Sequence, residues 1–218
     1  NWWLTWLRRL VEFTALRAIV QLTTAITGLI VIRFMDKDQY ALYAIIYQMQ
    51  FTASALADSG ISVGIRSIGG KVWRDTAKLS ELLSSALFLR RWFAAASLAA
   101  MLPLTFWLLY KNSKDIQTAA ILTSVVAIST IPLITSSVLI VVPQLYGAYR
   151  EIQKRELAVA LTRLALIATS AALYAGVTWA AIAGAIANWQ RLRFAHRWAT
   201  AKVNLGAPQN SYFRERIW

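Results

Sequence analysis

The feature that most limits what this chain can fold into is a series of long apolar runs separated by short polar gaps. The runs at residues 11–34, 82–110 and 116–142 each exceed the roughly 20 residues that a helix needs to cross a bilayer core. Over the whole chain 58% of the residues are hydrophobic and 15% are charged, and the mean hydropathy is +0.49. Because such runs recur along the whole chain, the sequence predicts an all-α, polytopic membrane protein.

Six transmembrane helices are predicted, at about residues 11–34, 40–64, 82–110, 116–142, 157–175 and 177–195. Together they form one bundle over residues 11–195. The bundle is preceded by an amphipathic segment, residues 1–10, and followed by a basic segment, residues 196–218, both expected in the cytoplasm. Only a few residues around Gly176 separate the last two spans, so these should form a helical hairpin.

The distribution of basic residues predicts the orientation. The chain has 23 Lys and Arg against 10 Asp and Glu. The gaps on one side hold Arg33, Lys37, Lys111 and Lys114, whereas nearly all the other cations, including Arg90 and Arg91, fall on the opposite side. Cytoplasmic loops carry the excess of Lys and Arg, so both ends of the chain should face the cytoplasm from the inner (plasma) membrane. Most loop cations are thus interpreted as topology signals, and no nucleic acid partner is expected.

Few residue types suited to covalent chemistry are available. The chain has no cysteine and a single histidine, His196, so no metal site and no cofactor are predicted. A membrane glycosyltransferase or polymerase would need catalytic groups on a substantial external loop, and the external gaps here are a few residues long. An enzyme is therefore not expected.

Three of the predicted helices carry polar residues along one face. The stripes are Thr14, Arg17, Gln21 and Thr24 in the first span, Tyr43, Tyr47, Gln50, Ser54 and Asp58 in the second, and Glu156, Arg163, Ser170 and Tyr174 in the fifth. Spacings of three and four residues place each set on one side of its helix. Three helices with one polar face each predict a hydrated interior cavity. Its candidate substrate-binding residues are Arg17, Gln21, Thr24, Tyr47, Gln50, Ser54, Asp58 and Arg163.

Arg17 and Asp58 are predicted to pair. Each lies about six residues, or ~9 Å, inside the cytoplasmic end of its span, and the two spans are consecutive. An unpaired charge at this depth costs at least a few kcal/mol. The pair would either hold the first two helices together or present Arg17 to an anionic substrate, with Asp58 orienting it.

Residues 16–70 resemble the opening of the polysaccharide (O-antigen type) flippases, which belong to the multidrug/oligosaccharidyl-lipid/polysaccharide exporter superfamily. The resemblance rests on the corner Arg33–Phe34, the acidic turn Met35–Gln39, Tyr40 and Tyr43, and the sequence Asp58, Gly60, Ile61 and Arg66. It departs from the family pattern at Ala41, where a glycine is usual, and at Met35–Asp36, where the corner usually has leucine and glycine.

The resemblance implies a fold of two six-helix lobes around a cationic cavity that opens alternately to each side, of which this chain supplies the amino-terminal lobe. It implies export of an undecaprenyl-pyrophosphate-linked glycan for cell-surface polysaccharide synthesis. The implied partners are the lipid-linked glycan, membrane lipids, and a second lobe that lies beyond residue 218 or belongs to another copy.

Two other functions fit the same residues. A non-transporting membrane scaffold of a polysaccharide assembly complex would need one lobe only. A drug or cation antiporter of the same superfamily would be expected to use carboxylates in its cavity, and Asp58 is the carboxylate placed well inside a span.

Overall fold

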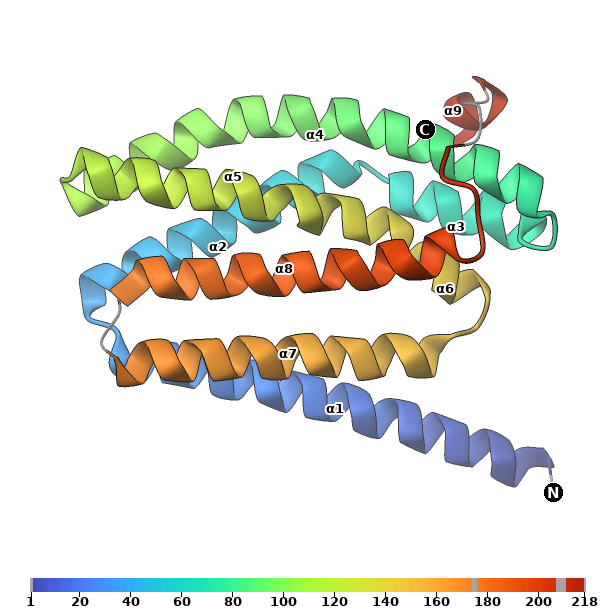
Figure 1. Ribbon diagram of the computed structural model, residues 1–218, viewed down its shortest axis with the longest axis horizontal. Coiled ribbons are helices and arrows are strands. Elements are labelled where there is room, and N and C mark those ends of the chain that lie inside the picture. The colour runs from blue at the N-terminus through green and yellow to red at the C-terminus, as the bar shows by residue number, and fades with distance from the viewer. Residues whose placement is uncertain (1, 174–175, 207–210, 218) are drawn as a thin grey trace.

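The structure, a computed structural model, describes residues 2–173, 176–206 and 211–217 (Figure 1). Within these ranges the chain is almost entirely helical. The helices are α1 (Trp2–Phe34), α2 (Lys37–Asp58), α3 (Ile61–Val72), α4 (Thr76–Ser113), α5 (Ile116–Leu139), α6 (Val141–Leu145), α7 (Tyr149–Ala172), α8 (Gly176–Thr200) and α9 (Ser211–Ile217). The predicted fold class, an all-α membrane helix bundle, is confirmed.

Membrane-length apolar helices are present. Residues 14–34, 76–113 and 116–145 are long and apolar enough to cross a membrane, judged by length and composition. Helices α2, α7 and α8 contain 22, 24 and 25 residues, and at 1.5 Å per residue each is also long enough to span a bilayer core. They are less apolar because they carry the polar residues of the interior.

Short capping sequences define several helix ends. The side chains of Asp75 and Asp115 accept hydrogen bonds from the first backbone N–H groups of α4 and α5. Helix α2 ends at Asp58, earlier than the predicted end at residue 64, because Ser59 and Gly60 adopt left-handed conformations with φ of 36° and 85°. Glycine takes this conformation at little cost, and the chain turns there into the separate helix α3.

The fifth and sixth predicted spans also differ at their ends. Helix α7 starts at Tyr149, before the predicted residue 157, and α8 continues to Thr200, past the predicted residue 195. The end of the fifth predicted span, residues 174–175, lies outside the described residues, as do residues 1, 207–210 and 218 of the two terminal segments. The predicted hairpin is present, because α7 and α8 pack against each other.

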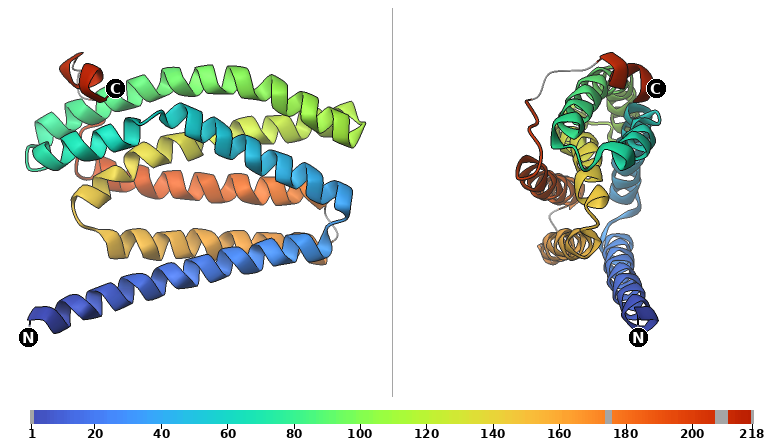
Figure 2. Two further views of the ribbon diagram at one scale, coloured as in Figure 1. Left: turned by 180° about the vertical axis from the view of Figure 1, so that it is seen from behind. Right: turned by 90° about the vertical axis from the view of Figure 1, so that its right-hand side faces the viewer.

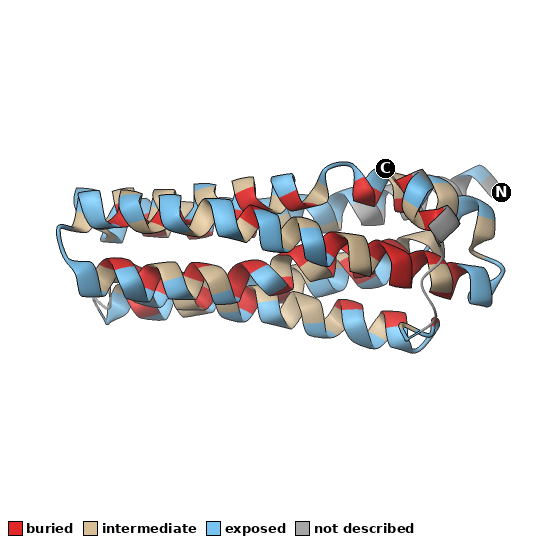
Figure 3. Cartoon of the chain, turned by 90° about the horizontal axis from the view of Figure 1, so that it is seen from above, coloured by how far each residue is buried: buried red, intermediate tan, exposed pale blue. Residues whose placement is uncertain are grey.

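The helices form two groups of unequal size. Helices α2, α4, α5 and α8 pack against one another, while α1 packs chiefly against α7, which is linked to the rest through α8. Figure 2 shows the α1–α7 pair at one edge of the molecule. Buried residues, red in Figure 3, run along the inside of the bundle.

The apolar core lies mainly in the larger group. One cluster contains Leu79, Leu82 and Leu83 of α4, and a second joins Ile46 of α2 to Leu122 of α5. On the α1–α7 side the buried cluster is small and contains Val31, Ile167 and Ala183. Apolar side chains gain little by leaving lipid for protein, so close approach through small residues matters more. Helix α8 follows this rule, since Ala180, Ala181, Ala183 and Ala187 are buried, with Ala181 in the cluster that includes α5 and Ala183 in the cluster that includes α1 and α7.

Candidate functional site

A cavity of about 260 Å³ lies between α1, α2, α5, α7 and α8. It lies between the small α1–α7 group and the larger group. Its polar lining residues are Thr24, Thr27, Tyr47, Gln50, Glu156, Arg163, Asn188 and Arg191. Two arginines and one carboxylate leave the lining with net positive charge, which suits an anionic ligand.

Arg163 of α7 is the central cation of this cavity. Its guanidinium lies over the ring of Tyr47, 4.5 Å from the centroid, and its Nη2 donates a hydrogen bond of 2.8 Å to the hydroxyl of Tyr43. Its Nε is buried without a hydrogen-bond partner. Among the residues that the structure describes, no carboxylate pairs with Arg163. A half-buried cation held by aromatic groups, with an unused donor, can accept an anionic partner from outside the chain.

The second cavity arginine, Arg191 of α8, is neutralised. Its Nη2 lies 2.5 Å from Oε2 of Glu156 on α7, and both side chains are about two-thirds buried. The Nε of Arg191, like that of Arg163, has no hydrogen-bond partner. The ion pair links the two helices of the hairpin across the cavity wall.

Neutral polar groups complete the wall on the α5 side. Gln50 of α2 donates from Nε2 to the hydroxyl of Ser129 at 2.6 Å, and Asn188 of α8 donates to the backbone carbonyl of Ser129 at 3.2 Å. Both amides therefore have a fixed orientation before any ligand binds. Their side-chain oxygens can accept hydrogen bonds, and so can the hydroxyl of Thr24, whose own hydrogen is donated to the backbone carbonyl of Val20 at 2.8 Å.

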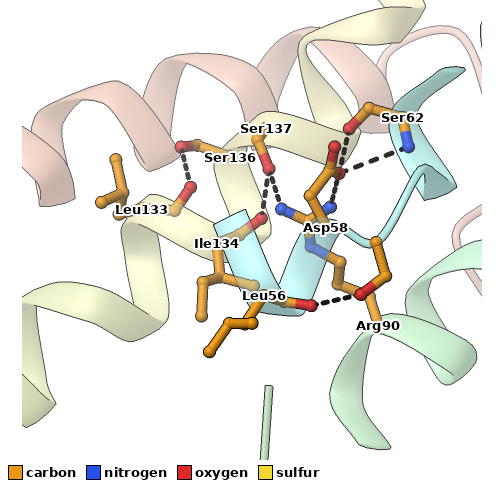
Figure 4. A network of polar contacts seen from close by, with 9 residues as sticks. Leu56, Asp58, Ser62, Arg90, Leu133, Ile134, Ser136 and Ser137 are labelled. Atoms are coloured by element: carbon orange, nitrogen blue, oxygen red, sulfur yellow. Dashed lines mark hydrogen bonds and ion pairs between the residues drawn. The ribbon is translucent and has the colours of Figure 1, made fainter. Parts of the chain in front are cut away.

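Asp58 has a different role from the one predicted. Its carboxylate pairs with the guanidinium of Arg90 on α4 and accepts two hydrogen bonds from Ser62, at 2.6 Å from the hydroxyl and 3.3 Å from the backbone N–H (Figure 4). Arg90 also donates to the hydroxyl of Ser137 on α5. Asp58 thus caps α3 at the corner after α2 and neutralises a buried arginine.

The predicted pair of Arg17 with Asp58 is wrong. Matching depth on consecutive helices would bring the two charges together only if α1 and α2 packed side by side. Instead α1 packs against α7, and α2 packs against α4, which presents Arg90 to Asp58. Arg90, interpreted from the sequence as a topology signal, is 2% exposed and belongs to the interior.

The structure separates the eight predicted binding residues into two sets. Thr24, Tyr47, Gln50 and Arg163 line the cavity; Arg17, Gln21, Ser54 and Asp58 are not among its lining residues. Arg17 and Gln21 are exposed on α1, and Ser54 is half-buried on α2. Tyr174 of the fifth stripe lies outside the described residues.

Sequence reasoning missed the contribution of α8. Gly184, Ala187, Asn188 and Arg191 line the cavity at spacings of three, one and three residues, which places them on one helix face. This stripe was visible in the sequence, but small residues make up half of it, and Arg191 was counted with the loop cations. Glu156 belonged to the recognised stripe of α7 without being assigned to the site.

Comparison with known proteins supports the architecture. No protein-family model and no curated protein sequence matches the chain. A crystal structure of MATE in complex with MaD3S matches with a TM-score of 0.70 and 14% sequence identity, over 95% of this chain. The match covers 49% of that chain, so the present chain spans about half the length of the solved transporter. The chain therefore has the same fold as about half of that MATE chain.

Proposed function

We propose that this chain is one lobe of a flippase that exports an undecaprenyl-pyrophosphate-linked glycan by alternating access. The observation that carries the proposal is Arg163, a cation in the wall of an interior cavity without a carboxylate partner among the described residues. The transporter-type fold and the flippase resemblance of residues 16–70 support it. No covalent step is needed, only binding and a change of access.

The pyrophosphate of such a substrate needs fixed cations in a sheltered site, because an anion leaving water loses its hydration. Arg163 offers a planar guanidinium whose Nε is unused, and Arg191 offers a second such donor beside Glu156. Tyr47 and Gln50 supply hydrogen bonds to phosphate oxygens or sugar hydroxyls, and Thr24, whose hydroxyl donates to Val20, can accept one from a sugar hydroxyl. Arg17 and Gln21, which continue the exposed face of α1, remain candidates for contacts made with the second lobe in place.

A second lobe is part of the proposal. A cavity of about 260 Å³ is below the usual volume even of small-molecule sites, roughly 300 to 1,000 Å³, and a lipid-linked glycan is larger. The lobe covers 49% of the solved transporter, so a second lobe, in the same chain or another copy, would close the other half of the cavity.

The main alternative is a cation or drug antiporter, which the MATE match favours at the level of fold. Such a protein needs a carboxylate free to exchange a proton for a cation. In this lobe Glu156 is held by Arg191, and Asp58 is held by Arg90 and Ser62. The positive lining therefore favours the anionic substrate.

The proposed orientation, with both ends of this chain in the cytoplasm, is tested by labelling. Cysteines placed singly at Lys71 and Gln153 should be protected from an impermeant thiol reagent in intact cells, and one at Asn112 should react. Reaction at Lys71 with protection at Asn112 would reverse the orientation and, with it, the direction of export.

The substrate is tested in cells that lack their own flippase, using the complete protein at matched membrane abundance. Arg163→Gln should reduce surface glycan at least roughly tenfold, since an interaction with a charged group is lost. Arg163→Lys should retain part of the activity, because a point charge still attracts phosphate. The matched control is Arg91→Gln, an exposed arginine of α4, which should display glycan normally. Normal display from Arg163→Gln, or cation resistance conferred without glycan display, would overturn the proposal.

A further inference from the structure

A second hollow, of about 700 Å³, lies between the first half of α7 and the last half of α8. Its lining includes Lys154 and Arg155 of α7 and Arg193, Phe194 and Arg197 of α8. The four cations among them lie roughly a quarter-turn or more around their helices from the cavity residues Arg163 and Arg191, although Val159 of α7 lines both hollows. The hollow, here named the hairpin groove, therefore adjoins the candidate transport site but presents a different set of cations.

The hairpin groove is strongly basic. Four of its lining residues are cations, and the one carboxylate, that of Glu151, accepts a hydrogen bond of 2.8 Å from the indole N–H of Trp198. The guanidinium of Arg155 lies over the ring of Phe194, 5.5 Å from its centroid. The aromatic rings give the groove apolar walls beneath its charged rim, an arrangement typical of membrane-interface sites.

One buried polar atom in the groove has no partner. The side-chain oxygen of Gln190 is buried and accepts no hydrogen bond from the residues that the structure describes. A buried acceptor left unpaired costs roughly 1–3 kcal/mol, so a ligand that brings a donor would be favoured here. Phosphate alone, when fully ionised, brings no such donor; a headgroup that also carries a hydroxyl does.

The surface of α8 beyond the groove is apolar. Ile186 precedes Arg193 by seven residues, two helical turns, and Trp179 precedes Ile186 by another seven, so all three share one face. Ile186 and Trp179 are 45% and 57% exposed. A ligand held by Arg193 at its charged end thus meets a continuous apolar strip of about 20 Å along the helix.

We propose that the hairpin groove binds the headgroup of an anionic phospholipid, with the phosphate among Arg193, Arg197 and Lys154, a headgroup hydroxyl at Gln190, and an acyl chain along the α8 strip. Basic pockets between transmembrane helices are a known setting for such headgroups. The site would hold a lipid at the outside of the hairpin, whatever the transported substrate is. It would brace α7 against α8, the two helices that position Arg163 and Arg191.

The test uses the complete protein in a mild detergent and three probes: phosphatidylglycerol, phosphatidylcholine and inorganic phosphate. Phosphatidylglycerol should raise the thermal unfolding midpoint more than phosphatidylcholine does, and should stay bound in native mass spectrometry. In Arg193→Gln/Arg197→Gln the lipid should bind roughly 30-fold more weakly, as expected from the loss of two interfacial cations. Both positions are exposed, so the lipid-free unfolding midpoint should not change.

The matched control is Lys71→Gln/Arg74→Gln, which removes two exposed cations from the same end of the bundle but outside the groove. Equal loss of binding in this control would show a general charge effect and overturn the site. Equal stabilisation by inorganic phosphate would replace the lipid with a free anion, and equal stabilisation by phosphatidylcholine would remove the anionic requirement. Either result overturns the proposal, and neither bears on glycan export by Arg163 variants.

Discussion

Two polar regions of the bundle each contain an arginine, buried in one and half-buried in the other, and they differ in what neutralises it. At the junction of α2, α3, α4 and α5, Arg90 pairs with Asp58 and donates to Ser137. In the cavity between α1, α7 and α8, Arg163 rests on Tyr47 and donates to the Tyr43 hydroxyl, and no described carboxylate balances it. Both arginines retain an unpaired Nε, so charge balance, not hydrogen-bond count, distinguishes them.

The difference separates a structural charge from a binding charge. Arg90 lies beside the large core cluster and its partner comes from the same chain, so it fixes the relative position of four helices. Arg163 lies where the buried apolar cluster is small and a cavity remains, so its counter-ion is left to a ligand. Removing the first charge should damage folding, whereas removing the second should damage binding.

The largest effect on stability is expected from Asp58→Asn. The amide can still accept from Ser62, but Arg90 becomes a buried cation without a counter-ion, which costs about 3 kcal/mol, at the low end for such pairs because the Asp58 side chain is 32% exposed. The free energy of unfolding in mixed detergent micelles measures the loss. The double variant Asp58→Asn/Arg90→Gln should recover part of it, and strictly additive losses would show that the two residues do not interact.

Arg163→Gln should have a much smaller effect on the same unfolding measurement. The change removes one cation–π contact and one hydrogen bond to a neutral hydroxyl, worth together about 1 kcal/mol, and it orphans no charge. A loss as large as that of Asp58→Asn would contradict the contrast between the two regions and make Arg163 a structural residue.

The variant Glu156→Gln tests whether the arginines of the cavity bind an anion. Removing this carboxylate leaves Arg191 free to face the cavity, so inorganic pyrophosphate should bind roughly fivefold more tightly, the effect of one partly exposed ion pair. Isothermal titration of the purified protein checks it, with Glu151→Gln in the hairpin groove as the matched control. Weaker binding to Glu156→Gln would mean that the carboxylate positions Arg191 for the anion.

The smallest effect concerns the cap of α5, outside both regions. The Thr118 hydroxyl and the backbone N–H groups of Thr118 and Gln117 donate to Asp115 and lower its pKa below the ordinary value. A lowered pKa in the folded state means that this contribution is present above the unfolded pKa and is lost as pH falls through the folded one. The difference in unfolding midpoint between wild type and Asp115→Asn should therefore shrink as pH falls below about 4. A difference independent of pH would exclude the charged cap.

Much of the architecture could be predicted from the sequence, because the length and hydropathy of each apolar run indicate a membrane-length helix without reference to the rest of the chain. The end of α2 at Ser59 and Gly60 was also indicated locally, by the glycine. However, the apolar residues Ile61 and Ile65 continued the hydrophobic pattern, so the predicted span was too long. Within the site, the polar stripes of α7 and α2 contain Arg163, Tyr47 and Gln50, which line the cavity in the structure. Their role in binding stays a prediction.

The sequence by itself determined the class of protein, the helices and the polar face of each, since hydropathy and helical periodicity are properties of neighbours along the chain. Only the tertiary structure decided which faces meet. Asp58 has Arg90 as its partner because α2 packs against α4, and Arg163 meets Tyr47 because α7 and α2 border one cavity. Two charges at the same depth in a membrane form an ion pair only if their helices are neighbours and the faces that carry the charges meet. Helix packing decides both conditions.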